Sequence, residues 1–130
     1  MPSSRVVPVL GYSSPTEAAD WLVRVLGFEK RLAIGEHRVQ MTFGESALVV
    51  AASSVEPAPA QVSTMLRVAS ADELYARALD HGATSVGEPV TDPYGERQAT
   101  VRDPWGHMWT LSKTVADSDP ADWGGELLDG

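Results

Sequence analysis

The side chains able to bind a metal or move a proton are few and scattered in this chain. His37 lies in a predicted turn, His81 in the last turn of a predicted helix, and His107 at the start of the last predicted strand. A facial metal triad needs two histidines and a carboxylate that converge on one point, which these separate segments do not suggest. A cation at a helix C-terminus is favourable, so His81 has a structural role available. We expect His107 to hydrogen-bond the turn before it.

Other catalytic arrangements are also missing from the sequence. There is no cysteine, which excludes disulfides, thiolate nucleophiles and cysteine-ligated metals. We find no Ser–His–Asp set, no phosphate-binding glycine loop and no paired carboxylates with a shared pocket. The sequence therefore predicts no metal site, no bound cofactor and no recognisable catalytic group.

Composition and charge narrow the class of partner. The 130 residues fit one domain, and 43% of them are apolar, enough to fill a core. The formal net charge of -8 repels phosphate backbones, so we expect no nucleic-acid partner. The same charge favours a cationic ligand weakly, although solubility is its more common role. No segment resembles a signal peptide or a membrane span, so we expect a cytoplasmic protein with no membrane partner.

The chain repeats one pattern of elements. Residues 6–10 read as a strand with Pro8 near its start, and Ser14, Pro15 and Glu17 form a capping box for a helix that Gly27 ends. Its predicted apolar face comprises Ala18, Trp21, Leu22, Val25 and Leu26.

The second half shows the same order. Residues 64–68 read as a strand, Ser70 and Glu73 form a second capping box, and Gly82 ends the helix. The cap serines lie 56 residues apart, as do the cap glutamates, and the stop glycines lie 55 apart. These matching offsets indicate an internal duplication. The predicted apolar face of this helix comprises Ala71, Leu74, Tyr75, Ala78 and Leu79.

Three strand-like segments follow each helix. They are residues 28–34, 38–43 and 46–52 in the first half, and 84–90, 98–102 and 107–113 in the second. We therefore predict an α+β fold in one domain, 1–130. It contains two βαβββ modules, 6–52 and 63–113, joined by a linker at 53–62 and followed by an acidic tail at 114–130. Each helix would cover the convex side of a curved mixed sheet, leaving a concave cleft for a ligand.

Several motifs resemble one known family. They are Tyr-Gly-Glu-Arg at 94–97, Asp-Pro-Trp-Gly-His-Met-Trp-Thr-Leu at 103–111 and Asp-Pro-Ala-Asp-Trp at 119–123. Together with the duplicated pattern over residues 6–113, they are similar to the vicinal oxygen chelate superfamily of glyoxalases, bleomycin-resistance proteins and dioxygenases, and to its PhnB-like branch. The resemblance implies a homodimer and a small-molecule site. It does not settle whether the cleft lies within one chain or is formed by exchange across the dimer.

The resemblance also allows a test for the family's metal. Its ligands are His, Gln or Glu on the first and last strand of each module, and these positions fall on Val7, on Ala51 or Ala52, on Ser63 and on Thr110. Imidazole and carboxylate groups bind a divalent cation, whereas hydroxyl groups alone bind it weakly. We therefore expect a metal-independent protein.

Strand alternation assigns side chains to the predicted cleft. If Thr110 faces it, Met108 and Ser112 do too, while Trp109 and Leu111 face the helix side with Trp21 and Leu22. The full set of candidate ligand-binding residues is Val7, Val9, Ser63, Met65, Arg67, Arg97, Trp105, Met108 and Thr110.

Three of these candidates have alternative roles. Arg67 either contacts an anionic ligand group or extends to the rim. Arg97, like the neighbouring Arg102, either binds a polar group or has an ordinary surface role. Trp105 is either a stacking lid or part of the packing of its turn.

Three functions remain open from the sequence. The leading hypothesis is a small-molecule-binding protein of the bleomycin-resistance type that sequesters a toxic or cationic organic compound. The alternative is a glyoxalase-like lyase or isomerase, or a dioxygenase-type enzyme, with an atypical site. A third possibility is a purely structural dimer partner. The sequence does not identify the ligand.

Overall fold

The computed structural model describes residues 6–54, 62–116, 120–126 and 128. Most of the linker predicted at 53–62 and parts of the predicted tail lie outside these residues. By its contacts the chain divides into two compact units. The first comprises Met1–Gln61 with Trp105–His107, and the second comprises Val62–Pro104 with Met108–Gly130. The turn at 105–107 is thus counted with the first unit, although the strands on either side of it belong to the second.

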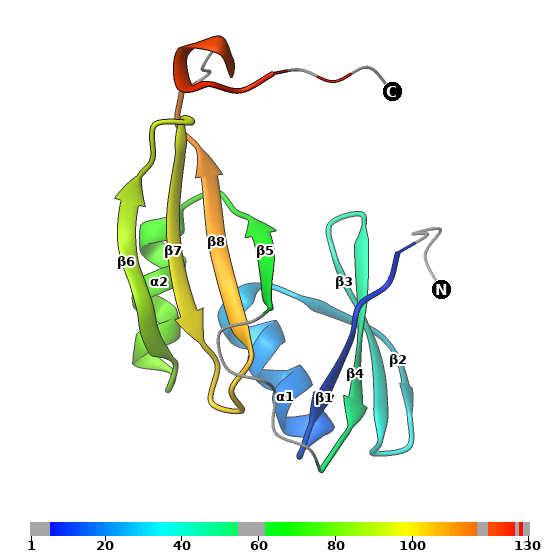
Figure 1. The fold of residues 1–130 in the computed structure, drawn as a ribbon. Helices are drawn as coiled ribbons and strands as arrows, with labels where there is room; N and C mark the ends of the chain where they lie inside the picture. Colours follow the sequence, from blue (N-terminus) through cyan, green and yellow to red (C-terminus); the bar gives the residue numbers. More distant parts are fainter. Residues whose placement is uncertain (1–5, 55–61, 117–119, 127, 129–130) are drawn as a thin grey trace. The chain divides into compact units, whose positions relative to one another are not determined.

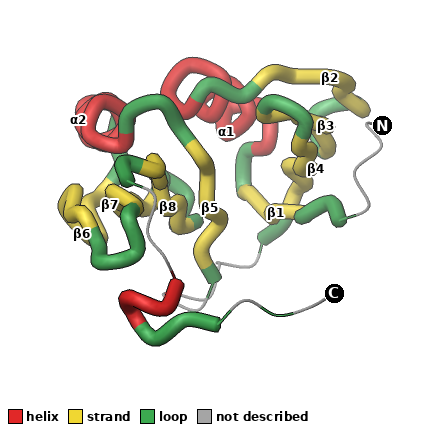
Figure 2. The backbone as a smooth tube through the Cα atoms, turned by 90° about the horizontal axis from the view of Figure 1, so that it is seen from above, coloured by secondary structure: helices red, strands yellow, loops and turns green. Residues whose placement is uncertain are grey.

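The first unit contains a four-stranded sheet with a helix on one face (Figures 1 and 2). Strand order is β1-β4-β3-β2, with β1 parallel to β4 and the other pairs antiparallel. Its elements are β1 (Val9–Tyr12), α1 (Pro15–Trp21), the π-helical turn η1 (Leu22–Leu26), β2 (Glu29–Ile34), β3 (Arg38–Phe43) and β4 (Ser46–Ala52).

The second unit repeats this arrangement. Its strand order is β5-β8-β7-β6, again with one parallel pair, β5 with β8. Its elements are β5 (Ser63–Arg67), α2 (Ala71–Asp80), β6 (Thr84–Thr91), β7 (Glu96–Arg102) and β8 (Met108–Thr114), followed by the short 3-10 helix η2 (Pro120–Trp123). The predicted α+β fold with two βαβββ modules is therefore confirmed.

The helix-facing side chains form the cores that the sequence predicted. Ala18, Trp21, Leu22, Val25 and Leu26 are all buried in the first unit. In the second unit the buried strand residues alternate with polar ones, as expected for a sheet with one face against a helix. These buried residues are Leu66, Ala99, Val101, Trp109 and Leu111. The predicted face of α2 is only partly correct, because Leu79 remains 36% exposed.

The first strand starts later than predicted, whereas the first helix ends at Gly27 as predicted. The first strand begins at Val9 rather than residue 6. Pro8 has no N–H to donate to a ladder, and it contributes only its carbonyl oxygen, which accepts from Val49 N at 2.9 Å. The first helix continues beyond Trp21 as a π-helical turn, and Gly27 ends it with φ of 90°, a conformation that favours glycine.

The two predicted capping boxes have different outcomes. Ser70 Oγ accepts a hydrogen bond from Glu73 N at 3.2 Å, as predicted. The Ser14 side chain makes no capping hydrogen bond, so that part of the prediction is wrong. Pro15 opens this helix instead, since its fixed φ suits the first helical position.

Two tryptophans that we expected on one shared helix side belong to different units. The Trp109 indole is buried in the second unit, and its Nε1 donates to the buried Asp103 carboxylate at 3.0 Å. Trp21 lies in the first unit, where its ring meets that of Trp105 edge-on at 6.4 Å between centroids. Both are core residues, as predicted.

His107 has a different partner from the one expected. Its Nε2 donates to the Gly11 carbonyl oxygen at 2.6 Å, and its ring lies 4.4 Å from that of Tyr12. The expectation that it bonds its own turn is therefore replaced by packing within the first unit. His81 behaves as predicted at the end of α2, where its Nδ1 donates to the Arg77 carbonyl oxygen at 2.8 Å. In the described residues, no helix has the length and apolar character needed to cross a membrane.

The unequal caps give a matched test. We expect Ser70→Ala to lower the free energy of unfolding by about 1 kcal/mol, because the Glu73 N–H loses its acceptor. Ser14→Ala should change it by less than half of that, since the Ser14 side chain caps nothing. Urea denaturation of both variants measures the difference, and equal losses would contradict it.

A second test concerns the buried Asp103–Trp109 bond. Asp103→Ala leaves the buried indole N–H without its acceptor, so we expect a loss of about 1–3 kcal/mol in unfolding free energy. Asp20→Ala is the control, because Asp20 pairs with Lys30 at the surface, where such a pair contributes about 0–1 kcal/mol. A smaller loss for Asp103→Ala than for Asp20→Ala would argue against this role.

Candidate functional site

The sheet of the second unit has one polar face. Its strands alternate between side chains directed at α2 and side chains on the opposite side. We call the opposite side the polar face, and its residues are Ser63, Met65, Arg67, Glu96, Gln98, Thr100, Arg102, Met108, Thr110, Ser112 and Thr114. Hydroxyl, amide, carboxylate and guanidinium groups therefore share one surface of a rigid sheet.

Three hydroxyl groups meet near the start of β8. The Ser63 and Thr110 hydroxyl oxygens lie 2.6 Å apart, and the Thr110 and Thr100 oxygens lie 3.2 Å apart. Both distances are in hydrogen-bonding range. Ser63 and Thr110 therefore meet diagonally across the parallel β5–β8 pair, in which Ser63 is opposite Met108 and Thr110 is opposite Met65.

These two residues occupy the metal-ligand positions predicted for the second half. In the first unit the residue equivalent to Thr110 is Val49, because Val49 pairs with Val9 as Thr110 pairs with Met65. Val49 precedes the predicted Ala51 by two residues on the same face, while Ala52 lies on the helix side. Aliphatic groups have no lone pairs to offer, and hydroxyls bind divalent cations weakly. The residues present do not fit the family's metal.

The described residues contain no other arrangement suited to a metal ion. Within those ranges, no three or more histidine, aspartate or glutamate side chains gather closely enough to hold one.

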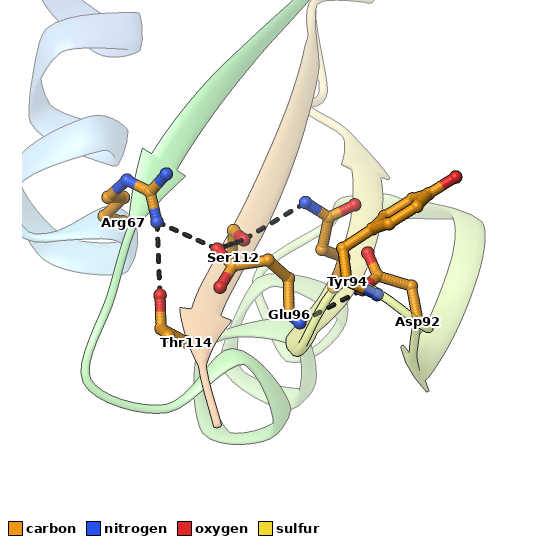
Figure 3. Close-up of polar contacts among 7 residues, drawn as sticks. Arg67, Asp92, Tyr94, Glu96, Ser112 and Thr114 are labelled. Carbon is orange, nitrogen blue, oxygen red and sulfur yellow. Dashed lines mark hydrogen bonds and ion pairs between the residues drawn. The ribbon is translucent and has the colours of Figure 1, made fainter. Parts of the chain in front are cut away.

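A second network crosses the polar face near the end of β8 (Figure 3). Arg67 Nη1 donates to Glu96 Oε1 at 2.8 Å and to Thr114 Oγ1 at 3.4 Å. Ser112 Oγ donates to the same Glu96 oxygen at 3.2 Å, and Gln98 Nε2 donates to Ser112 Oγ at 3.1 Å. Glu96 is thus the common acceptor of this network. Its side chain is 18% exposed, whereas that of Arg67 is 70% exposed.

These contacts set the protonation of Glu96. The hydrogen bond with Thr114 holds the pKa of Glu96 below its ordinary value of 4.5, and Arg67 and Ser112 lower it further by hydrogen bonding and, for Arg67, by charge. Partial burial opposes this effect without reversing it. Glu96 is therefore a carboxylate at neutral pH.

The backbone before β7 is held by a neighbouring turn. Asp92 Oδ1 accepts from Tyr94 N at 2.9 Å and from Glu96 N at 3.0 Å (Figure 3). Aspartate side chains commonly stabilise turns in this way. The Asp92 turn fixes the residue from which the Glu96 side chain projects, so the network starts from a defined backbone.

The structure brings together some of the predicted ligand-binding residues and separates others. Ser63, Met65, Arg67, Met108 and Thr110 share the polar face, and Met65 is 51% exposed there. Arg97 lies on the other face, where its Nε donates to the α2 residue Asp72 at 2.9 Å. It holds the start of the helix and does not join this group.

The remaining candidates belong to the first unit. Trp105 contacts Tyr12 edge-on at 5.8 Å between ring centroids, and also Trp21, which favours the packing role over a lid. Val9 is 56% exposed on the face opposite α1, which also presents Leu32 and Ile34. Val7 precedes β1 and is half-buried.

Glu96, Gln98, Thr100 and Thr114 were missed by the sequence analysis as members of the site. The available signal was alternation along β7, where every second residue from Glu96 to Arg102 is polar or charged. We placed that strand two residues late, at 98, which left Glu96 in the preceding turn.

The first unit also contains a groove. It is open, has a volume of about 540 Å³ and is lined by Asp20, Val23, Arg24, Phe28, Glu29 and Lys30. Its opposite charges, Lys30 and Asp20, already pair with each other.

Comparison with known proteins identifies the family. The model of the Glyoxalase/Bleomycin resistance protein/Dioxygenase superfamily matches residues 6–111, most of the chain. The chain belongs to this superfamily. A crystal structure of TioX from Micromonospora sp. ML1 is similar, with 32% identity and a TM-score of 0.70, over 87% of this chain and 100% of that one.

More distant likenesses concern the fold or a shorter segment. The fosfomycin resistance protein FosX from Listeria monocytogenes has a TM-score of 0.73 at 13% identity, over 87% of this chain and 94% of that one, which shows a shared fold alone. Among curated sequences, the uncharacterized protein Mb0911c of Mycobacterium bovis is 38% identical over 56 residues. That match covers 43% of this chain and 37% of the relative's length.

The lowered pKa of Glu96 predicts a pH-dependent stability. A pKa that is lower in the folded state stabilises the fold above the unfolded-state pKa, and this contribution is lost as pH falls through the folded-state value. We expect wild type to exceed Glu96→Gln in unfolding free energy at pH 7, and the gap to shrink as pH drops below 4.5. Denaturation at several pH values measures the gap.

The control for this prediction is Thr114→Val, which removes the largest cause of the shift. It should raise the Glu96 pKa measured by NMR and move the pH range of the gap upward. A gap that stays constant from pH 7 to pH 3 would contradict the assigned role of the Glu96 carboxylate.

Proposed function

We propose that this chain is a metal-independent protein that binds a small organic molecule on the polar face of its second unit. The observation that carries the proposal is the set of hydroxyls at the family's metal-ligand positions in this unit, where Ser63 and Thr110 bond to each other. Hydroxyl groups such as these are better suited to hydrogen bonding with an organic ligand than to binding a divalent cation. Sequestration of a toxic or cationic compound is the concrete form of this function.

The side chains around those hydroxyls support an amphiphilic ligand. Met65 presents a half-exposed thioether, which adapts its shape to different apolar groups. Arg67 presents an exposed guanidinium that the Glu96 carboxylate holds in place. A molecule with an apolar body and a few polar groups would meet complementary partners on this face.

The enzyme alternative needs a general base. Glu96 is the carboxylate on the polar face, but its lowered pKa and its hydrogen bonds make it a weak proton acceptor. This favours a fixed charge with a binding role. A homodimer in the cytoplasm remains our proposal for the assembly and location of the protein.

Thermal-shift measurements test the proposed function. We would screen divalent metal salts, 2-oxoaldehyde–glutathione adducts and cationic antibiotics. An organic compound that binds the folded state should stabilise it by about 2.7 kcal/mol at a hundred times its dissociation constant. Stabilisation by an organic compound, without a response to metals, is the expected result.

A pair of variants locates the binding. Met65→Ala removes an exposed apolar side chain from the polar face, and Leu79→Ala removes one from α2. The first should weaken the response to the stabilising compound several-fold, and the second should leave it unchanged. Stabilisation by a metal salt alone, or equal effects of the two variants, would refute the proposal.

A further inference from the structure

The Glu96 carboxylate imposes a direction on the hydrogen bonds around it. An ionised carboxylate accepts hydrogen bonds and donates none. The Ser112 hydroxyl lies 3.2 Å from Glu96 Oε1 and must therefore donate its one hydrogen to that oxygen. Its lone pairs are left to accept the bond from Gln98 Nε2 at 3.1 Å. The hydrogen bonds thus run in one direction, with Gln98 donating to Ser112 and Ser112 donating to Glu96.

This direction also fixes how the Gln98 carboxamide is turned. If the amide were reversed, its carbonyl oxygen would face the lone pairs of Ser112, and both groups would lack a proton to share. The nitrogen consequently points to Ser112, and the carbonyl oxygen points away from it. In the part of the chain that the structure describes, Gln98 Oε1 accepts no hydrogen bond, and the side chain is half-buried on the polar face.

Arg67 complements this acceptor with donors. Its Nη1 is occupied by Glu96 and Thr114. Its Nε and Nη2 donate to no acceptor among the described residues, and the side chain is 70% exposed. The guanidinium is bound at one nitrogen and its side chain is largely exposed, so the polar face offers a donor as well as an acceptor.

We propose that Gln98 Oε1 accepts a hydrogen bond from an N–H group of the bound molecule, and that Glu96 is the positioning residue that keeps this oxygen available. The inference rests on the proposed function and specifies its ligand class. That class is organic molecules with a secondary amide, whose N–H group meets Gln98 while Arg67 can donate to a carbonyl oxygen. Glu96 orients Gln98 through Ser112, holds Arg67 by their ion pair, and does not touch the ligand.

The first experiment compares two probes of nearly equal shape by NMR. N-methylbenzamide carries the required N–H, and methyl benzoate replaces it with an ester oxygen. We expect N-methylbenzamide to shift the side-chain amide signals of Gln98 and to bind about fivefold more tightly, as one added hydrogen bond allows. Equal affinity for the two probes, or binding that leaves the Gln98 signals unmoved, would overturn the proposal.

Variants separate recognition from folding. Gln98→Met should remove the preference for the amide probe, because a thioether sulfur is only a weak hydrogen-bond acceptor. Gln40→Met is the matched control, because Gln40 is a half-buried glutamine on a strand of the first unit. It should leave the preference intact, and loss of the preference in Gln40→Met as well would refute the assignment to Gln98.

The positioning role of Glu96 has its own readout. As pH falls through the Glu96 pKa, protonated Glu96 can donate to Ser112, and the Ser112 hydroxyl can then donate to Gln98 instead. The NMR signals of the Gln98 side chain should therefore shift with the Glu96 titration even without a probe. Ser112→Ala should abolish that coupling while Glu96 still titrates. Gln98 signals that ignore the titration in wild type would overturn the orientation, whereas failure of binding with the coupling intact would count against the proposed function alone.

Discussion

An ionised carboxylate can only accept hydrogen bonds, and that single limit orders the polar face of the second unit. Glu96 lies at the start of β7, where the Asp92 turn holds its backbone, and three neighbouring groups bond its side chain. Were this position neutral and able to donate, the Ser112 and Gln98 groups would have two competing orientations. The charge of Glu96 therefore determines which atoms of Ser112 and Gln98 donate hydrogen bonds and which accept them.

The sheet beneath this network supplies the rigidity that the polar groups lack. Serine hydroxyls and glutamine amides rotate easily, so their directions need a fixed backbone to be reproducible. The β7–β8 ladder places Gln98 opposite Ser112 and Glu96 opposite Thr114, and Ser112 reaches Glu96 diagonally. Strand pairing thus determines which polar groups meet, and the carboxylate determines which of them donates.

The fold was predictable because its signals are local and occur twice. Helix stops at Gly27 and Gly82, and the Ser70 cap, follow from the residues themselves. Failures arose where a residue's role depends on distant neighbours. Nothing near His107 in sequence indicates that it bonds the Gly11 carbonyl oxygen, 96 residues away.

Prediction of the candidate site succeeded and failed for the same reason. Alternation correctly placed Thr110, Met108 and Ser112 on one face once a strand was assigned. A boundary error of two residues hid Glu96, and the motif around Arg97 gave no sign that this arginine lies on the helix side, paired with Asp72. The sequence predicts which face of a sheet a residue lies on only where the strand boundaries are themselves predicted correctly.

The two copies of the module have kept one side and changed the other. The buried positions directed at the helices are apolar in both units, while Val9 and Val49 of the first unit correspond to Met65 and Thr110 of the second. Because neighbouring residues on a strand point in opposite directions, the two faces of each sheet can differ in chemistry, although Val49 and Ser112 on the outward face are themselves buried. A gene that carries this module twice can therefore vary the polar groups on one copy's outward face while both copies keep the apolar contacts between helix and sheet.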